Sequence, residues 1–240
     1  MADQGLAESR EKAKRLIMAG MVHLVRGELR ERVDKPGRQL EPDAVLEVES
    51  PQKYVSRGGE KLETAIEHFG IDPAGKVCLD AGASTGGFTD CLLQHGAAKV
   101  YAADVGKGQL DVKLREDPRV VNLEKINLRD AAEDLIAEPV DMIVADVSFI
   151  SLSKILPPCL KFLRPGGEIV ALVKPQFELW PGAAVKGVVR DEDLQKRAVV
   201  MVADLMVNEH GMDFKGHVPS KIKGPKGNQE FLIYLVDSSV

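Results

Sequence analysis

Short, nearly unbroken apolar runs alternate along most of the chain with segments whose apolar residues recur every three or four positions. Uninterrupted apolar runs are typical of strands buried in a parallel sheet, and the longer spacing indicates helices. The pattern predicts strands at residues 77–81, 99–104, 119–123, 141–146, 168–173 and 230–236. It predicts helices at residues 60–68, 85–95, 107–115, 129–137, 151–163 and 191–210. Such alternation predicts a doubly wound α/β sheet with helices on both faces.

The first 50 residues follow a different pattern. Ser9 is a candidate N-cap for a helix over residues 10–19, and short apolar runs predict strands at 21–25 and 45–48. A helix with small strands makes a compact α+β module. We therefore predict a small domain at residues 1–50, a linker at 51–57 that begins with Pro51, and the α/β domain at 58–240.

Composition is that of an ordinary globular protein. The chain has 240 residues, of which 44% are hydrophobic and 29% charged. Its apolar runs are far shorter than the ~20 residues of a membrane span, and its charged beginning does not resemble a signal peptide. The three cysteines form no C-x-x-C pair, which argues against a zinc site or a disulfide framework. We expect reduced thiols, a cytoplasmic location, no bound metal and no membrane contact.

Basic residues are concentrated in two segments although the net charge is −5. Residues 10–38 contain nine Lys or Arg and four acids, and residues 214–229 contain four lysines and no acid. Such segments can be merely solvated faces, but on an acidic protein they favour local contact with a polyanion. The candidate polyanion-binding residues are Arg10, Lys12, Lys14, Arg15, Lys35, Arg57, Lys223 and Lys226.

A glycine-rich turn, D-A-G-A-S-T-G-G, follows the predicted strand at 77–81. Its spacing is neither that of a dinucleotide-binding turn nor that of a phosphate-binding loop. A carboxylate at Asp80 would repel a pyrophosphate but attract the positive charges of S-adenosylmethionine. Asp104, at the end of the next strand, would accept hydrogen bonds from the two ribose hydroxyls, and Ser84 or Thr85 would cap the following helix. The candidate cofactor-binding residues are Asp80, Gly82, Ala83, Ser84, Gly86, Gly87, Phe88, Asp104 and Val105.

Charged residues also follow two apolar strands. Asp146 and Lys174 end such strands, where ligands bind in open α/β sheets. If the last strand is antiparallel to its neighbours, its first residue, Glu230, lies at the same edge of the sheet. A buried charge must be paired or change its protonation, so Asp146 and Lys174 could also be only a structural salt bridge. By pattern alone, Lys61 would be a solvated lysine near a helix start.

Several motifs together resemble one family. They are S-R-G-G-x-K-L at 56–62, L-D-A-G-A-S-T-G-G-F-T-D at 79–90, D-V-S-F-I-S at 146–151, V-K-P-Q-F-E at 173–178, G-V-V-R-D at 187–191 and G-P-K-G-N-Q-E-F-L at 224–232. These closely resemble the TlyA (haemolysin A) family of FtsJ-like ribosomal RNA 2′-O-methyltransferases. The first segment, with S-R-E-K-A-K-R-L-I-M-A-G and V-D-K-P-G, resembles an S4 RNA-binding domain whose opening element is missing or reduced.

The resemblance implies a Rossmann-like methyltransferase domain, S-adenosylmethionine as cofactor, and ribosomal RNA or a ribosomal subunit as partner. By motif it places a catalytic tetrad on Lys61, Asp146, Lys174 and Glu230, and it places Asn127 near the adenine. Under this hypothesis Lys174, held by Asp146 and Glu230, faces a ribose 2′-hydroxyl and stabilises or accepts charge as methyl transfer proceeds. No metal is required for this chemistry.

Other functions are weighed against this one. A base-directed N-methyltransferase would carry two prolines after Asp146, and a short-chain dehydrogenase would need a Tyr-x-x-x-Lys pair; neither is present. A non-catalytic RNA-binding or ribosome-assembly factor that retains the fold is the main alternative. The family's older name suggests a haemolytic role. The sequence does not support it, because it contains no basic amphipathic helix with an aromatic face.

Overall fold

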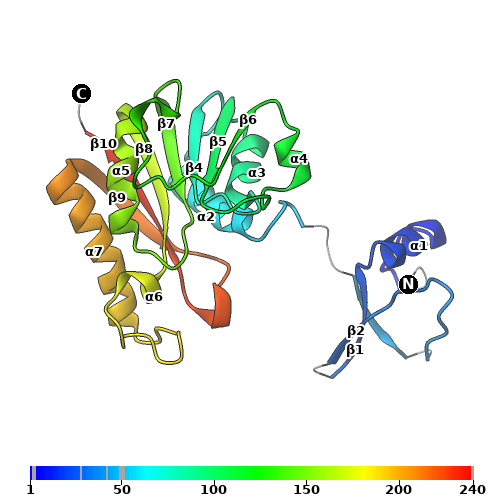
Figure 1. The fold of residues 1–240 in the computed structure, drawn as a ribbon. Coiled ribbons are helices and arrows are strands. Elements are labelled where there is room, and N and C mark those ends of the chain that lie inside the picture. The colour runs from blue at the N-terminus through cyan, green and yellow to red at the C-terminus, as the bar shows by residue number, and fades with distance from the viewer. Residues whose placement is uncertain (2–3, 28, 42, 49–51, 239–240) are drawn as a thin grey trace. The chain divides into compact units, whose positions relative to one another are not determined.

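The computed structural model describes residues 1, 4–27, 29–41, 43–48 and 52–238. It divides into two compact units, Met1–Gln52 and Lys53–Val240, whose elements are labelled in Figure 1. Pro51, which the sequence places in the linker, lies outside the described residues. In the part of the chain that the structure describes, no helix has the length and apolar character needed to cross a membrane.

The first unit is a helix beside a small antiparallel sheet. The helix is α1 (Arg10–Met18), and the Ser9 hydroxyl caps it by accepting a hydrogen bond from the Lys12 amide at 3.1 Å. The strands are β1 (Val22–Arg26), β2 (Leu29–Arg32) and β3 (Val45–Val48), in the order β2-β1-β3. The predicted helix and two strands are confirmed. The sequence missed β2 because all its side chains are exposed, so it has no apolar pattern.

The second unit is built on a sheet with the order β6-β5-β4-β7-β8-β10-β9 (Figure 1). The strands are β4 (Val77–Ala81), β5 (Lys99–Asp104), β6 (Val120–Glu124), β7 (Val140–Ala145), β8 (Leu163–Val173), β9 (Met212–Pro219) and β10 (Phe231–Asp237). Strands β4 to β8 are parallel, and β10 runs antiparallel between β8 and β9. The predicted doubly wound α/β fold is confirmed.

Helices cover both faces of this sheet. They are α2 (Gly58–Phe69), α3 (Gly87–Gln94), α4 (Val112–Arg115), α5 (Leu156–Cys159), α6 (Pro175–Glu178) and α7 (Glu192–His210). Successive side chains of a strand point to opposite faces. Cys78 of β4 therefore packs in one core with α2, α3 and α4, and Leu79 packs in the other with α5 and α7. Burial of both faces explains why the strands carry continuous apolar runs.

Three predicted helices are much shorter in the structure. The described residues contain four 3₁₀ turns, at Glu133–Leu135, Leu152–Lys154, Leu160–Phe162 and Pro225–Gly227. Of the helix predicted at 107–115 only α4 forms, and at 129–137 only the 3₁₀ turn Glu133–Leu135, which has no buried side chain. The helix predicted at 151–163 is broken into α5 and two 3₁₀ turns, because Pro157 and Pro158 cannot donate backbone hydrogen bonds.

Two further differences concern β8 and β9. The sequence predicts this strand only from residue 168, whereas β8 begins at Leu163 and accommodates residues 164–167 as a bulge between its pairs with Val140 and Met142 of β7. Strand β9 was not predicted, because most of its side chains are exposed at the edge of the sheet. An edge strand lacks the double-sided burial that makes inner strands recognisable.

Candidate active site

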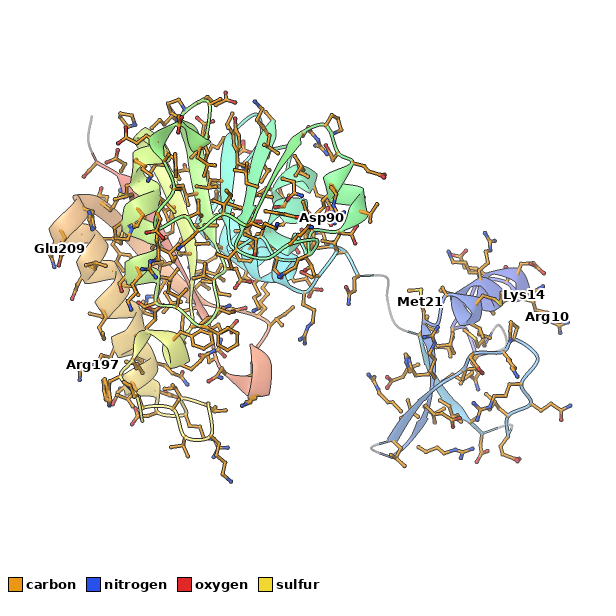
Figure 2. The ribbon with its side chains drawn as sticks, viewed as in Figure 1. Arg10, Lys14, Met21, Asp90, Arg197 and Glu209 are labelled. Carbon is orange, nitrogen blue, oxygen red and sulfur yellow. The ribbon has the colours of Figure 1, made fainter. Side chains whose placement is uncertain are left out.

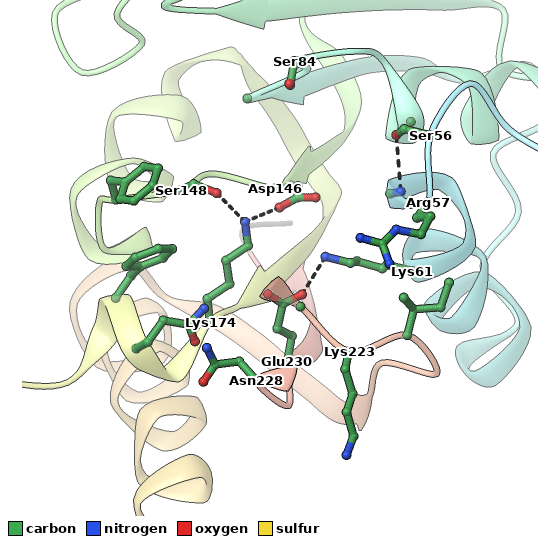
Figure 3. Close-up of a pocket in the computed structure, with 18 of the residues that line it drawn as sticks. Ser56, Arg57, Lys61, Ser84, Asp146, Ser148, Lys174, Lys223, Asn228 and Glu230 are labelled. Carbon is green, nitrogen blue, oxygen red and sulfur yellow. Dashed lines mark hydrogen bonds and ion pairs between the residues drawn. The ribbon is translucent and has the colours of Figure 1, made fainter. Parts of the chain in front are cut away.

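A pocket of about 710 Å³ lies at the carboxyl ends of the parallel strands of the second unit (Figure 3). Asp146 is the first residue after β7, and Lys174 is the first after β8. Because β10 is antiparallel to β8, Glu230 comes immediately before β10 at the same edge. Lys61 of α2 completes the set. The structure thus brings all four residues of the predicted tetrad to the lining of one pocket.

Lys174 is held from two sides in this pocket. Its Nζ lies 2.6 Å from Asp146 Oδ1 and donates a hydrogen bond to Ser148 Oγ at 2.8 Å. Only 7% of Lys174 is exposed. A charge with so little solvent must be compensated by the protein, and here Asp146 compensates it. One of the three N–H groups of the ammonium is donated to Ser148, whereas the contact with Asp146 Oδ1 is an ion pair without a hydrogen bond, so an N–H group remains for a substrate atom.

Glu230 forms a second ion pair across the same pocket with Lys61, not with Lys174 as the sequence predicts. Lys61 Nζ donates to Glu230 Oε2 at 2.6 Å (Figure 3). Glu230 is fully buried and Lys61 is 9% exposed. The pattern-based interpretation of Lys61 as a solvated lysine is therefore wrong. Its position on α2 becomes buried because that helix packs against β10, a contact that joins residues far apart in the sequence.

The glycine-rich turn depends on close backbone contacts. Gly82 has φ +93°, and a Cβ there would lie 3.0 Å from the Asp146 carbonyl oxygen. A Cβ at Gly87 would lie 2.3 Å from Ser56 Oγ. Neither Ser84 nor Thr85 caps α3, because the chain enters that helix at Gly86 with φ +96° and no side-chain cap. The predicted serine or threonine cap is therefore wrong.

A second cavity of about 560 Å³ adjoins the first. The two share lining residues Gly82, Ser84, Asp146, Ser148 and Phe149. Candidates Asp104, Val105 and Asn127 line the second cavity, whereas Ala83, Gly87 and Phe88 line the first. The predicted cofactor-binding residues other than Asp80 and Gly86 therefore surround one continuous space.

Asp104 also holds the glycine-rich turn in place. Its Oδ2 accepts a hydrogen bond from the Ser84 amide at 2.9 Å, and its Oδ1 accepts one from the Gly106 amide at 2.7 Å. A carboxylate offers about four lone-pair sites, so each oxygen can still accept a second hydrogen bond. Asp104 can consequently fix the turn and bind two hydroxyl groups at the same time.

Asp80 lies beneath the turn. It is fully buried, its Oδ2 accepts a hydrogen bond from the Thr89 hydroxyl at 2.7 Å, and it lines neither cavity. Gly86 also lies outside both linings, where a Cβ would meet Leu114 of α4 at 2.2 Å. The direct contact that the sequence assigns to these two residues is thus not found. Asp80 can act on a bound cation only through its field.

Burial, with a smaller contribution from the nearby Asp146 carboxylate, raises the pKa of Asp80 to about 7. Ionisation therefore costs more in the folded protein than in the unfolded chain, so this group lowers stability as pH rises from about 4 to about 7. We expect the wild type to lose about 2 to 3 kcal/mol more unfolding free energy between about pH 5 and pH 8 than the Asp80→Asn variant. Urea unfolding at both pH values measures this difference. Exposed Asp204→Asn is the control and should follow the wild type.

The segment that precedes α2 is fixed to the second unit. The Val55 amide donates to Asp90 Oδ2 at 2.9 Å, and the Gln94 side-chain amide donates to the Lys53 carbonyl at 3.0 Å. The Ser56 hydroxyl accepts a hydrogen bond from the Gly58 amide at 3.3 Å. Part of the predicted linker therefore forms one wall of the pocket.

Two phenylalanines at the pocket were missed by the sequence-based reasoning. Phe149 is 90% exposed, has φ +64°, and lies 5.2 Å from the Phe177 ring, centroid to centroid. An exposed aromatic in a left-handed backbone conformation is costly and is found most often at functional sites. The pair offers a face on which a planar group can stack. The sequence shows the phenylalanine at 149 but not its backbone conformation.

Asn228 is a further missed residue at the pocket. Its side-chain oxygen accepts from the Val189 amide at 3.1 Å, and its NH₂ group donates to the Gly187 carbonyl at 2.8 Å. It thus joins the loop before α7 to the loop before β10. Both loops contribute to the pocket lining.

The basic candidates fall into two groups. Arg57, Lys223 and Lys226 line the 710 Å³ pocket of the second unit. The other five are exposed on the first unit, where Arg10 and Lys14 project from α1 (Figure 2). Arg10, Lys14 and Lys35 line a separate cavity of about 580 Å³ within that unit. Among the described residues, no cluster of three His, Cys, Asp or Glu side chains could hold a metal ion.

Comparison with known proteins agrees with this geometry. The family model of FtsJ-like methyltransferases matches residues 54–236. The 16S/23S rRNA (cytidine-2'-O)-methyltransferase TlyA of Mycobacterium tuberculosis is 45% identical over 240 residues, which cover 97% of this chain and 86% of that protein. Hemolysin A of Brachyspira hyodysenteriae is 44% identical over 234 residues, which cover 97% of this chain and 96% of that protein. A solved structure named "Putative hemolysin" from Streptococcus thermophilus matches with a TM-score of 0.77 at 44% identity. The match covers 98% of this chain and 85% of that one.

Proposed function

We propose, from the premise that this chain belongs to the FtsJ-like methyltransferase family, that it transfers a methyl group from S-adenosylmethionine to a ribose 2′-hydroxyl of ribosomal RNA. The similarity to a relative named as a 16S/23S rRNA (cytidine-2'-O)-methyltransferase supports a cytidine as the target. The observation that carries the proposal is the pair of lysine–carboxylate contacts in one pocket beside a glycine-lined cavity.

The two adjoining cavities fit the proposed cofactor. Asp104 has acceptor sites left for two ribose hydroxyls, and Asn127 lies farther along the same cavity. Gly82 lets the turn pack closely against the Asp146 carbonyl, and it lines both cavities. When bound, S-adenosylmethionine supplies a methyl group activated by a positively charged sulfur. In its ionised form, buried Asp80 favours such a charge from beneath the turn.

We assign to Lys174 the role of facing the reacting ribose oxygen and stabilising its developing charge. A ribose hydroxyl is a weak nucleophile until its proton leaves or the developing charge is stabilised. Lys174 donates one N–H to Ser148 and forms an ion pair with Asp146, so another of its N–H groups can face that oxygen. An ammonium held in this way stabilises negative charge without reorganising during the reaction.

Lys61 supplies the second positive charge. Its pairing with buried Glu230 fixes the ammonium at the opposite wall of the pocket from the Lys174 contact (Figure 3). From there it favours the entry of an RNA phosphate and the charge that develops on the sugar. Exposed Phe149 and its half-buried neighbour Phe177 offer a stacking surface for the base of the same nucleotide. Most of the rate enhancement then comes from positioning.

A methyl-transfer assay tests the proposed function. The protein is incubated with S-adenosylmethionine carrying a labelled methyl group and with purified small or large ribosomal subunits, and label in the extracted RNA is counted. We expect incorporation into RNA from at least one subunit. Titration calorimetry with the cofactor separates the main alternative, since a non-catalytic RNA-binding factor would bind RNA without binding S-adenosylmethionine. Absence of both binding and label would reject the proposal.

Arg57, Lys223 and Lys226 are proposed to contact the phosphates that flank the target. Each phosphate contact releases counterions, so binding weakens as salt increases. Replacing any one of the three with alanine should lower the slope of log Kd against log salt concentration by about one. RNA binding measured over a salt series gives the slope. Lys196→Ala, on the exposed side of α7, is the control and should leave the slope unchanged.

The first unit is proposed to contribute further RNA contacts. Its exposed residues Arg10, Lys12, Lys14, Arg15 and Lys35 are the candidates, and they suit the S4-like role expected from the sequence. Because ribosomal RNA is the proposed substrate, the cytoplasm is the proposed place of action.

A further inference from the structure

Ser148 occupies a position in the pocket that neither the tetrad nor the cofactor-binding set includes. It lies two residues after Asp146, in the segment that follows β7, and it lines both adjoining cavities. Its hydroxyl is therefore located where the proposed methyl donor and the target nucleotide meet. The Lys174 ammonium donates to this hydroxyl at 2.8 Å (Figure 3).

A single contact with Asp146 would not fix the direction of the Lys174 ammonium. Lysine is a point charge on a flexible four-carbon chain, and the 2.6 Å ion pair with Asp146 Oδ1, which accepts no hydrogen bond, leaves its N–H groups free to rotate. A second contact with Ser148 defines the orientation of the group. Lys61 differs, because the contact that the structure gives its ammonium is to Glu230.

The backbone around Ser148 is itself held in place. The Asp146 amide donates to the Ala81 carbonyl at 3.2 Å, which ties the start of this segment to β4. Phe149 follows with φ +64°, a conformation that a bulky residue adopts only when its surroundings determine it. The Ser148 hydroxyl is thus presented by a fixed segment rather than by a free loop.

We infer that Ser148 is a positioning residue: its hydrogen bond orients the Lys174 ammonium, which the ion pair with Asp146 holds in the pocket, so that another N–H faces the reacting 2′-oxygen. The inference rests on the proposed function, because it concerns the rate of the same methyl transfer. The residue moves no proton in this account. Its effect is on geometry, and such effects appear in the rate of the chemical step.

Kinetics of Ser148→Ala and Ser148→Thr test this role. The alanine variant should lose about ten- to a hundredfold in kcat, with the KM for RNA and the Kd for S-adenosylmethionine within about twofold of wild type. The threonine variant retains the hydroxyl and should recover most of the loss. Exposed Ser153→Ala is the matched control and should behave as wild type. An unchanged kcat in Ser148→Ala, or no recovery in a folded Ser148→Thr, would overturn the inference.

A second readout does not require RNA. Lysine acetylation with limiting acetic anhydride, mapped by peptide mass spectrometry, reports how firmly each amine is held. Lys174 should be labelled faster in Ser148→Ala than in wild type, when both are normalised to exposed Lys154. Equal labelling would contradict the inference. If the wild-type protein transferred no methyl group, the proposed function would fail, and labelling alone would decide whether Ser148 holds Lys174.

Discussion

Replacing Lys174 with alanine is expected to lower the rate of methyl transfer by at least about a thousandfold. The ammonium is the group that we place beside the reacting oxygen, fixed by Asp146 at 2.6 Å and by Ser148 at 2.8 Å. Without it the developing negative charge has no fixed partner at that position, and water is a poor substitute because it must reorganise. Binding of S-adenosylmethionine should change little, because Asp104 and the glycine-rich turn remain.

Two measurements separate these effects. Single-turnover kinetics with saturating RNA give the rate of transfer, and titration calorimetry gives the affinity for the cofactor. Lys154→Ala removes an exposed lysine close to the site in sequence and should leave both quantities unchanged. Near-normal turnover in Lys174→Ala would defeat the assigned role. If Lys174→Ala lost both cofactor binding and turnover, the lysine would instead be needed to maintain the cavity.

Replacing Glu230 with alanine is expected to destabilise the protein as well as inactivate it. Glu230 is fully buried and accepts from Lys61 Nζ at 2.6 Å, so the variant leaves a buried ammonium without its carboxylate. Breaking a buried pair in this way costs about 3 to 5 kcal/mol. For a unit of this size that corresponds to a fall in Tm of about 6 to 20 °C. Thermal unfolding followed by circular dichroism measures it.

A double variant distinguishes loss of charge balance from loss of contacts. Glu230→Gln with Lys61→Met removes both charges and keeps similar side-chain volumes, so its Tm should be closer to wild type than that of Glu230→Ala. Its methyl-transfer activity should stay low, because the positive charge of Lys61 is gone. If Glu230→Ala were as stable as wild type, the pair would not be the buried contact described above. If the double variant were active, Lys61 would have no role in the mechanism.

The inner strands could be predicted because their physical cause is local. Strands β4 and β5 begin and end where the apolar pattern predicts, since burial on both faces demands apolar residues throughout. The same logic placed Asp146 and Lys174 correctly, as the first charged residues after such runs. Glu230 followed from an antiparallel last strand, which the pairing of β10 with β8 confirms.

Other features depend on contacts between distant parts of the chain. Lys61 and Glu230 are 169 residues apart, and only the packing of α2 against β10 turns an apparently solvated lysine into a buried one. The resemblance to a known family supplied Lys61; its local pattern did not. Strand β9 escaped prediction for a related reason, since its pairing with β10 rather than an apolar pattern defines it.

The supporting residues of the site were the least predictable. Ser148 and Phe149 stand inside a motif that the sequence displays, yet nothing in their types indicates that one contacts Lys174 and the other adopts φ +64°. The predicted cap at Ser84 or Thr85 failed similarly, because helix α3 is entered through glycines that allow the close contacts at Ser56 and Leu114. Such details follow from tertiary packing rather than from local propensity.

In the proposed mechanism, two lysine–carboxylate pairs direct a methyl group to a ribose oxygen of ribosomal RNA. Nucleoside mass spectrometry tests it most directly, on RNA incubated with S-adenosylmethionine and either the wild type or Lys174→Ala. We expect a nucleoside methylated on its ribose with the wild type and none above background with the variant. A methyl group on a base, or equal ribose methylation by both proteins, would contradict it.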